Sequence, residues 1–149
     1  MVKRSAGLLL WRRGPAGIEV LLGHPGGPLF ASKDTWTIPK GEYDEAEQPL
    51  TAARREFAEE LGLPAPPGPF VALGEVKQPG GKLVTVWAVE GDLDATLARS
   101  NLFSMQWPPR SGRWQEFPEL DRAQWFALDD AQVFPAQTAF LERLRELLH

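Results

Sequence analysis

The sequence has no cysteine and only two histidines, His24 and His149, among its 149 residues. The absence of cysteine excludes disulfides, thiolate nucleophiles and Cys-ligated zinc. With so few histidines, a His-rich metal site is equally disfavoured. These two shortages remove thiol enzymes and His-rich metalloenzymes from the candidate classes.

The chain also lacks a long hydrophobic run. The apolar stretch near the N-terminus, residues 5–11, is very short and is interrupted by Arg12 and Arg13, so we do not expect a secretory signal. No other window approaches the roughly 18 apolar residues that a membrane span needs. We therefore expect a soluble cytoplasmic protein.

Neither sign of charge is in large excess. The 16 basic and 20 acidic residues give a net charge of -4, so the chain has no overall attraction for nucleic acid or anionic membranes. A length of 149 residues with 43% hydrophobic residues is enough for one sizeable core. The sequence predicts one domain over residues 1–149, without a linker, repeat or low-complexity tract.

Apolar runs and turn signals predict a succession of strands and two helices. The expected strands cover residues 5–12, 18–24, 35–38, 70–78, 82–90, 114–117 and 123–128. Lys40 and Gly41 are expected in a loop after the third strand, and residues 100–113 in a long loop. A helix is predicted over residues 49–61, from a stripe formed by Leu50, Ala53, Phe57 and Leu61, and another over 136–148. This order predicts an α/β fold with a mixed sheet covered on both faces.

Three glutamates share one side of the helix predicted over residues 49–61. Glu56 and Glu60 are four residues apart, and Glu56 and Glu59 are three apart, so their side chains meet on the helix surface. Like charges at such spacings cost roughly 0.2–0.5 kcal/mol per pair, and Arg55 is the obvious counter-charge. Clustered carboxylates suit Mg2+, or Mn2+ as a substitute. An ordinary solvated acidic face is the alternative interpretation.

The residues around these glutamates extend the pattern into a longer motif, G-x5-E-x7-R-E-U-x-E-E-x-G-U, where U is bulky and aliphatic or aromatic. Its fixed positions are occupied by Gly41, Glu47, Arg55, Glu56, Phe57, Glu59, Glu60, Gly62 and Leu63. This motif is the Nudix box, and the chain resembles the Nudix hydrolase family at every fixed position. The flanking residues 36–41 and 125–126 also resemble the family.

The resemblance implies an α/β/α sandwich in which the box forms a loop-helix-loop that binds Mg2+. Arg55 would hold Glu59 in place, and Glu47 would support the loop or the start of the helix, where a carboxylate is favourable. The implied metal ligands are the backbone carbonyl of Gly41 and the carboxylates of Glu56, Glu59 and Glu60.

Many Nudix enzymes add a carboxylate from a loop outside the box, often six residues before an aromatic residue that begins a late strand. Glu119 lies six residues before Trp125. By this resemblance we take Glu119 as a further metal ligand or as the general base. Glu116 is the alternative, and an ordinary surface acid is the competing interpretation of Glu119.

Negative charge accumulates on the oxygens of a phosphoryl group during its transfer, so we expect cationic side chains in the site in addition to a metal ion. Lys40, next to the box, is the first candidate to bind substrate. Lys33, Arg110 and Arg113 are further candidates, and each also fits an ordinary surface charge.

Two tryptophans could stack on a nucleobase. These are Trp36 and Trp107, and burial in the core is the competing interpretation for both. His24 is interpreted as a loop residue rather than a base.

The box predicts metal-dependent hydrolysis of a phosphoanhydride bond in a nucleotide-type small molecule, but it does not select the leaving group. The stretch WTIPKG at 36–41 resembles the dinucleoside polyphosphate hydrolase and nucleoside triphosphate pyrophosphohydrolase branches, so a diadenosine tetraphosphate-like substrate is expected first. An oxidised nucleoside triphosphate or an RNA 5' end competes, followed by ADP-ribose or a nucleotide sugar. A catalytically silent ligand-binding module is the alternative of another class. No membrane partner and no other nucleic acid is expected, and the oligomeric state is left open.

Overall fold

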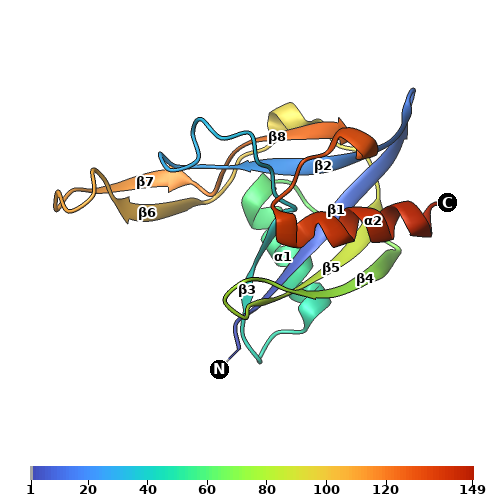
Figure 1. The fold of residues 1–149 in the computed structure, drawn as a ribbon, viewed down its shortest axis with the longest axis horizontal. Coiled ribbons are helices and arrows are strands. Elements are labelled where there is room, and N and C mark those ends of the chain that lie inside the picture. Colours follow the sequence, from blue (N-terminus) through green and yellow to red (C-terminus); the bar gives the residue numbers. More distant parts are fainter. Residues whose placement is uncertain (1) are drawn as a thin grey trace.

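Strand β1 (Arg4–Gly14) is the centre of a six-stranded sheet in the computed structural model, which describes residues 2–149 (Figure 1). It pairs in parallel with β5 (Leu83–Glu90), and on its other edge it pairs antiparallel with β3 (Lys40–Tyr43) and β2 (Gly17–Pro25). The outer strands are β4 (Phe70–Lys77) beside β5 and β8 (Leu120–Ala127) beside β2. The predicted mixed sheet is confirmed.

Alternate residues of β1 contribute to two separate cores, because successive side chains of a strand point to opposite faces. Leu8 and Leu10 belong to the core that includes α1 (Pro49–Leu61), and Leu9 and Trp11 belong to the core that includes α2 (Thr138–Leu147). Figure 1 shows α2 in front of the sheet and α1 behind it. The two helices therefore cover opposite faces of one sheet.

Helix α1 has the bounds that its sequence predicts. Pro49 stands at its first turn, and Gly62 ends it with φ 66°, a left-handed conformation that glycine adopts without penalty. The N–H of Gly62 donates to the carbonyl of Ala58 at 2.8 Å. Phe57 and Leu61 are fully buried as predicted. Within residues 2–149, neither helix has the length and apolar character that crossing a membrane would require.

Two sequence predictions were wrong in the region before α1. Residues 35–38 do not form a strand: Trp36 and Thr37 make only isolated bridges, to Val133 and Gly23. The N–H of Ile38 donates instead to the side chain of Gln137, at 2.9 Å. Ile38 therefore does not continue the pairing that Thr37 makes with Gly23. The next strand, β3, begins at Lys40, so Lys40 and Gly41 are not in a loop.

The predicted long loop at 100–113 was also wrong. It contains β6 (Leu102–Gln106), which pairs antiparallel with β7 (Trp114–Pro118) in a separate two-stranded sheet. From Phe103 onward, Phe103 and Met105 alternate with Ser104 and Gln106, and this alternation is the strand signal that the prediction missed. We call residues 102–118 the arm, because Figure 1 shows this hairpin projecting away from the main sheet.

Candidate functional site

A polar cavity of about 310 Å3 lies between α1, β3 and the base of the arm. The structure brings all five predicted metal ligands together there, with Lys40 beside them, which is half of the predicted site residues. The lining residues are Ser5, Lys40, Gly41, Glu42, Glu56, Glu59, Glu60, Lys82, Asn101 and Glu119.

Helix α1 presents its three glutamates to the cavity with different exposure. Glu56 and Glu60 are each only 9% exposed, whereas the Glu59 side chain is 42% exposed. Arg55 Nη1 donates to Glu56 at 2.9 Å and to Glu59 at 3.2 Å. The Nε and Nη2 atoms of Arg55 donate to the carboxylate of Glu47 at 2.8 and 2.9 Å. Arg55 is thus fixed by Glu47 and in turn orients two glutamates of the cavity.

The charges around Arg55 agree with this geometry. Hydrogen bonding to Glu47 is the main cause that raises the pKa of Arg55 above its ordinary value. The same hydrogen bonds lower the pKa of Glu47. The pair is therefore ionised at neutral pH and provides a stable anchor beside the cavity.

Among the cavity carboxylates, Glu60 has the pKa that departs furthest from its ordinary value. Burial, followed by the negative charge of Glu56, raises the pKa of Glu60 to about 8. Its carboxylate accepts one backbone hydrogen bond, from the N–H of Lys40 at 3.1 Å, which offsets part of this effect. Burial also raises the pKa of Glu56. Two neighbouring buried carboxylates of this kind are stabilised in the charged form by a cation.

The raised pKa of Glu60 predicts that the free energy of unfolding of the metal-free protein depends on pH. The pKa of Glu60 rises from an ordinary 4.5 to about 8 on folding, so the folded state binds this proton more tightly and loses stability as pH rises between these values. Glu60→Gln is therefore expected to stabilise the metal-free protein by about 2–4 kcal/mol at pH 8 and by little near pH 4.5. Thermal unfolding with chelator at both pH values measures this difference.

Glu59→Gln is the matched control, since Glu59 is the exposed member of the three and its removal should change stability little at either pH. An equal gain from Glu60→Gln at pH 4.5 and pH 8 would contradict the assignment of a buried, proton-binding carboxylate.

Gly41 allows the chain to pass close to Glu56. A Cβ atom at position 41 would overlap the Glu56 carboxylate, so only glycine fits there without displacing that side chain. The neighbouring Lys40 is half-buried, and burial lowers its pKa, with the charge of Lys82 acting in the same direction. Lys40 and Lys82 are thus close enough to repel each other, and a phosphate between them would be favoured.

Glu119 enters the cavity from the segment that joins β7 to β8. Its N–H donates to the carbonyl of Asn101, and its own carbonyl accepts from Gly26 N–H, both at 2.9 Å. Partial burial raises the pKa of Glu119. Glu116 is instead an exposed residue of β7 and does not line the cavity. The geometry thus favours Glu119 over Glu116 as the carboxylate added from outside the box.

The base of the arm is joined to the C-terminal end of α1. The N–H of Asn101 donates to the carbonyl of Glu59 at 2.9 Å, and Arg99 N–H donates to the carbonyl of Leu61 at 2.8 Å. These bonds satisfy carbonyls that a helix end leaves free. They fix the last turn of α1, which carries Glu59 and Glu60.

The expectation that Trp36 stacks on a base is corrected by its burial. Trp36 is only 3% exposed, and its Nε1 donates to Asp34 at 3.0 Å. Its ring packs edge-on against His24 and Phe126, with centroids 5.2 and 4.7 Å apart. Trp36 is therefore a core residue, which was the competing interpretation.

The interpretation of His24 as a loop residue is also corrected. His24 lies in β2, is fully buried, and its ring contacts the Asp121 carboxylate at 2.9 Å and the carbonyl of Lys33 at 2.6 Å. The exposed side chain of Lys33 does not line the cavity. His24 is a structural link between β2, β8 and the following loop.

The remaining substrate candidates lie on the arm. Trp107 and Arg113 form the last pair near its tip, where the N–H of Trp107 donates to the carbonyl of Arg113 at 2.9 Å, and Arg110 is exposed in the turn between them. None of the three lines the cavity. Their predicted contact with substrate is therefore not supported within one chain, and Figure 1 shows the arm projecting away from the main sheet.

Several cavity residues were missed by the sequence analysis. Ser5 in β1 is 1% exposed and its hydroxyl has no hydrogen-bond partner within residues 2–149. Glu42 stands opposite Ser5 in the β1–β3 register, and the Lys82 ammonium lies 3.7 Å from its carboxylate. Asn101 precedes the arm. Lys82 follows a turn and carries no motif, so only the tertiary fold reveals its position, whereas Glu42 adjoins the box and could have been considered.

The oxygen-rich lining fits a divalent cation in its chemistry. Two of the carboxylates are nearly buried, repel each other, and lie beside the backbone of Gly41. Within residues 2–149, no three acidic or histidine side chains already converge on one point that could hold an ion. Arg55 Nη1 bonds Glu56 and Glu59 in this arrangement. A bound cation would compete with Arg55 for these oxygens.

An apolar cleft of about 430 Å3 adjoins the cavity through Lys40. Phe134 and several prolines form its walls, and Thr37 and Gln137 are among its polar residues. The Gln137 amide is already engaged, because it accepts from Ile38 N–H and donates to Thr37 Oγ1, both at 2.9 Å. The lining residues are Pro25, Thr37, Lys40, Gln78, Pro79, Phe134, Pro135, Ala136 and Gln137.

Comparison with known proteins gives a consistent result. The family model described as NUDIX domain matches residues 1–148. The 8-oxo-(d)GTP phosphatase of Mycolicibacterium smegmatis is 37% identical over 140 residues, which cover 86% of this chain and 36% of that protein. The RNA pyrophosphohydrolase of Brucella anthropi is 38% identical over 63 residues, which cover 42% of this chain and 32% of that protein. The chain thus spans about a third of the length of the curated relatives that it matches.

The fold agrees with a solved structure as well. The Ap4A hydrolase of C. elegans, in a binary complex, superimposes with a TM-score of 0.69 at 21% sequence identity. The match covers 97% of this chain and 97% of that one. At this identity the likeness establishes the fold, and it confirms the α/β architecture expected from the sequence.

Proposed function

Since the chain belongs to the Nudix family, we propose that it acts, as one domain over residues 1–149, as a metal-dependent hydrolase of phosphoanhydride bonds in nucleoside-linked polyphosphates. The observation that carries this proposal is that Glu56, Glu59, Glu60 and Glu119 line one cavity together with two lysines, Lys40 and Lys82. Oxygen donors for a hard cation and ammonium groups for phosphate thus occur side by side.

The proposed cofactor is Mg2+, with Mn2+ as a substitute. The residues that would hold it are the Gly41 carbonyl and the carboxylates of Glu56, Glu59 and Glu60, and Glu119 is either a further ligand or the general base. When bound, the cation neutralises the phosphate chain and lowers the pKa of the attacking water.

The side chains of the cavity then have separate tasks. Lys40 and Lys82 bind the non-bridging phosphate oxygens, where charge accumulates during transfer. Glu119 accepts the proton of the water whose oxygen forms a new bond to phosphorus, while the opposite anhydride P–O bond breaks and the nucleotide leaves with its electron pair. Partial burial raises the pKa of Glu119 toward neutrality, which makes this carboxylate a better base. Arg55 positions the glutamates and does not contact substrate.

The first proposed substrate is a dinucleoside polyphosphate, and the second is a nucleoside triphosphate, including an oxidised one. The apolar cleft beside Lys40 supports a nucleoside next to the phosphate chain, because its walls are Phe134 and prolines. The identity of 37% with an 8-oxo-(d)GTP phosphatase supports the second candidate. Other candidates are an RNA 5' end, ADP-ribose and a nucleotide sugar.

Product identification on a panel of substrates tests the proposal. The panel contains diadenosine tetraphosphate, ordinary and oxidised deoxynucleoside triphosphates, ADP-ribose and a 5'-triphosphate RNA, each with Mg2+ and with chelator. Metal-dependent cleavage of one member identifies the reaction and the leaving group. Binding of nucleotides without turnover across the panel would instead favour the silent ligand-binding module.

The assignment of the base gives a separate prediction. Glu119→Gln is expected to lower kcat by about 100-fold, within the range reported for loss of a general base, whereas Glu116→Gln should leave kcat within about twofold. Glu116 is the matched control, since it is an exposed glutamate on the neighbouring strand. Steady-state kinetics with the best substrate of the panel measures both. A larger loss from Glu116→Gln would reassign the role to Glu116.

A further inference from the structure

Part of the surface of the arm is not covered by any other element of the same chain among residues 2–149. Its strands pair Phe103 with Phe117, Met105 with Gln115 and Gln106 with Trp114. Within residues 2–149, no other strand pairs with either outer edge of this two-stranded sheet. A lone hairpin is marginally stable in water unless another element packs against it. A partner that packs on the arm would therefore stabilise it.

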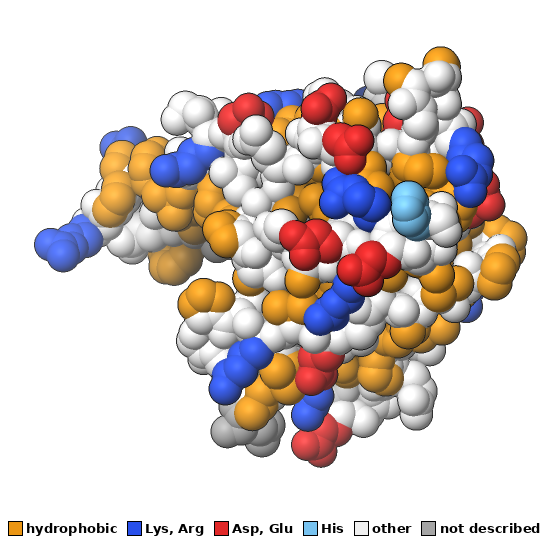
Figure 2. Space-filling model, turned by 45° about the vertical axis from the view of Figure 1, so that its right-hand side comes forward, with side chains coloured by type: hydrophobic (Ala, Val, Ile, Leu, Met, Phe, Trp, Pro, Cys, Tyr) orange, Lys and Arg blue, Asp and Glu red, His pale blue; other side chains and the backbone are white. Residues whose placement is uncertain are grey.

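The composition of the arm is typical of a protein interface. Residues 102–118 include two tryptophans, two phenylalanines, one methionine and two arginines, with no lysine or aspartate and one glutamate. Interface cores are enriched in the first four types and depleted in the charged residues other than arginine. Trp114 is 69% exposed and Leu102 is 56% exposed. Figure 2 shows hydrophobic side chains over the projecting arm and basic side chains at its end.

The charges of the arm and of the remaining chain are complementary. The arm carries Arg110 and Arg113 against Glu116, while the whole chain has a net charge of -4, so the rest of the protein is acidic. A second copy therefore offers the arm a surface of opposite charge. Two arginines are too few to favour a single-stranded nucleic acid, whose backbone needs a longer positive groove.

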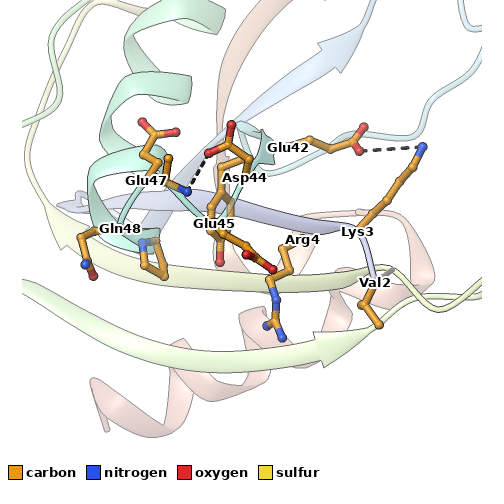
Figure 3. Close-up of a pocket in the computed structure, with 11 residues that line it drawn as sticks. Val2, Lys3, Arg4, Glu42, Asp44, Glu45, Glu47 and Gln48 are labelled. Atoms are coloured by element: carbon orange, nitrogen blue, oxygen red, sulfur yellow. Dashed lines mark hydrogen bonds and ion pairs between the residues drawn. The ribbon is translucent and has the colours of Figure 1, made fainter.

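One groove outside the arm matches it in charge and in its apolar lining. It has a volume of about 820 Å3 and lies beside β3 and the start of α1 (Figure 3). Apolar atoms of Tyr43 and Pro49 line part of it. Its charged lining has four acids and two bases, Glu42, Asp44, Glu45, Glu47, Lys3 and Arg4. No residue of the arm of the same chain lines this groove, and Figure 1 shows the arm projecting away from β3 and α1.

We propose that the arm of one copy docks in this groove of a second copy, so that two chains form a symmetric dimer with two reciprocal arm contacts. Trp114 and Leu102 would cover the apolar part of the groove, and the arginines at the tip would meet its carboxylates. Such an arrangement closes on itself under twofold symmetry, which is the commonest form of soluble oligomer. The inference does not depend on the proposed enzymatic activity.

Sedimentation velocity of the full chain over a range of concentrations tests this interface. The expected result is a reversible dimer that dissociates on dilution. Trp114→Glu should raise the dimer dissociation constant by about 30-fold or more, as expected for the loss of an aromatic hot spot. Leu97→Glu is the matched control, because Leu97 is 58% exposed but lies outside the arm and the groove, and it should leave the constant unchanged. A chain that is monomeric at every concentration, or a dimer indifferent to Trp114→Glu, overturns the proposal.

Exchanging one charge of the arm with one charge of the groove tests whether this groove is the docking site. The result does not depend on whether the Trp114 variant folds. Arg113→Glu and Glu45→Arg should each weaken the dimer by about tenfold, because each places like charges in contact. The two substitutions together should restore the dissociation constant to within about threefold of the original. Glu45 is suited to this exchange because it makes no ion pair with any of residues 2–149. A double variant that is as weak as the single ones would overturn docking in this groove.

Discussion

Replacing Glu60 by glutamine is expected to lower kcat by about 100- to 1,000-fold, and Glu56→Gln is expected to do the same. Both side chains line the cavity and are nearly buried, and each supplies a negative oxygen that a cation would need. Loss of one such electrostatic contact to the transition state typically costs this factor. Steady-state kinetics over a range of Mg2+ concentrations measures it, and the apparent affinity for Mg2+ should fall in parallel.

Stability measurements separate this loss from unfolding. Glu60→Gln should unfold at a higher temperature than the original chain at pH 8 in chelator, since it removes a buried carboxylate whose pKa is about 8. An inactive variant that is also more stable is the signature of a site residue. Glu142→Gln is the control, because Glu142 is exposed on α2 and should keep full activity. Full activity of Glu60→Gln would contradict the proposed metal site.

Gly41→Ala is expected to lower kcat/KM by more than about 100-fold. The added Cβ would overlap the Glu56 carboxylate, so this side chain or β3 must shift. Displacements of about 1 Å at a reacting centre are enough to produce a loss of this size. The measurement is the same kinetic assay, together with the far-UV circular dichroism spectrum to show that the sheet is intact.

Gly81→Ala provides a demanding control for this substitution. Gly81 has φ 93°, which an alanine adopts with strain, but its Cβ would meet no other atom within 4 Å. The variant should lose about 1 kcal/mol of stability and keep its activity. Equal loss of activity in both variants would show that a general loss of stability, rather than contact with Glu56, explains the effect of Gly41→Ala.

The sequence predicted the parts of this protein that depend on local periodicity. The stripe through Ala53, Phe57 and Leu61 defined α1 and its buried face, and Glu56 and Glu60 followed from it as neighbours on the same side. Gly62 correctly marked the helix end because the left-handed turn there requires a residue without a side chain. Placement of Glu119 in the cavity agrees with the resemblance of its spacing from Trp125 to a family pattern.

The parts that failed depend on contacts between distant segments. Trp36 is buried because β2 and β8 bring His24 and Phe126 to its ring, and neither neighbour is close in sequence. Lys82 reaches the cavity only because β5 pairs in parallel with β1, which places it near Glu42. The strand over residues 114–117 was predicted, but its partner β6 lies in residues 100–113, which were predicted to be a loop. Local patterns contain no information on which of these distant partners will meet.

The double role of β1 restricts how the chain can change in length. Leu8 and Leu10 face one core while Leu9 and Trp11 face the other, so deletion of a single residue within this strand would exchange the two sets and misplace both. Substitutions of similar size should survive in evolution far more often than insertions or deletions there. The turn that follows is free of this restriction, since a side chain at Gly17 would face open space. Variation in length among descendants of this sequence should therefore accumulate at that turn and spare the strand.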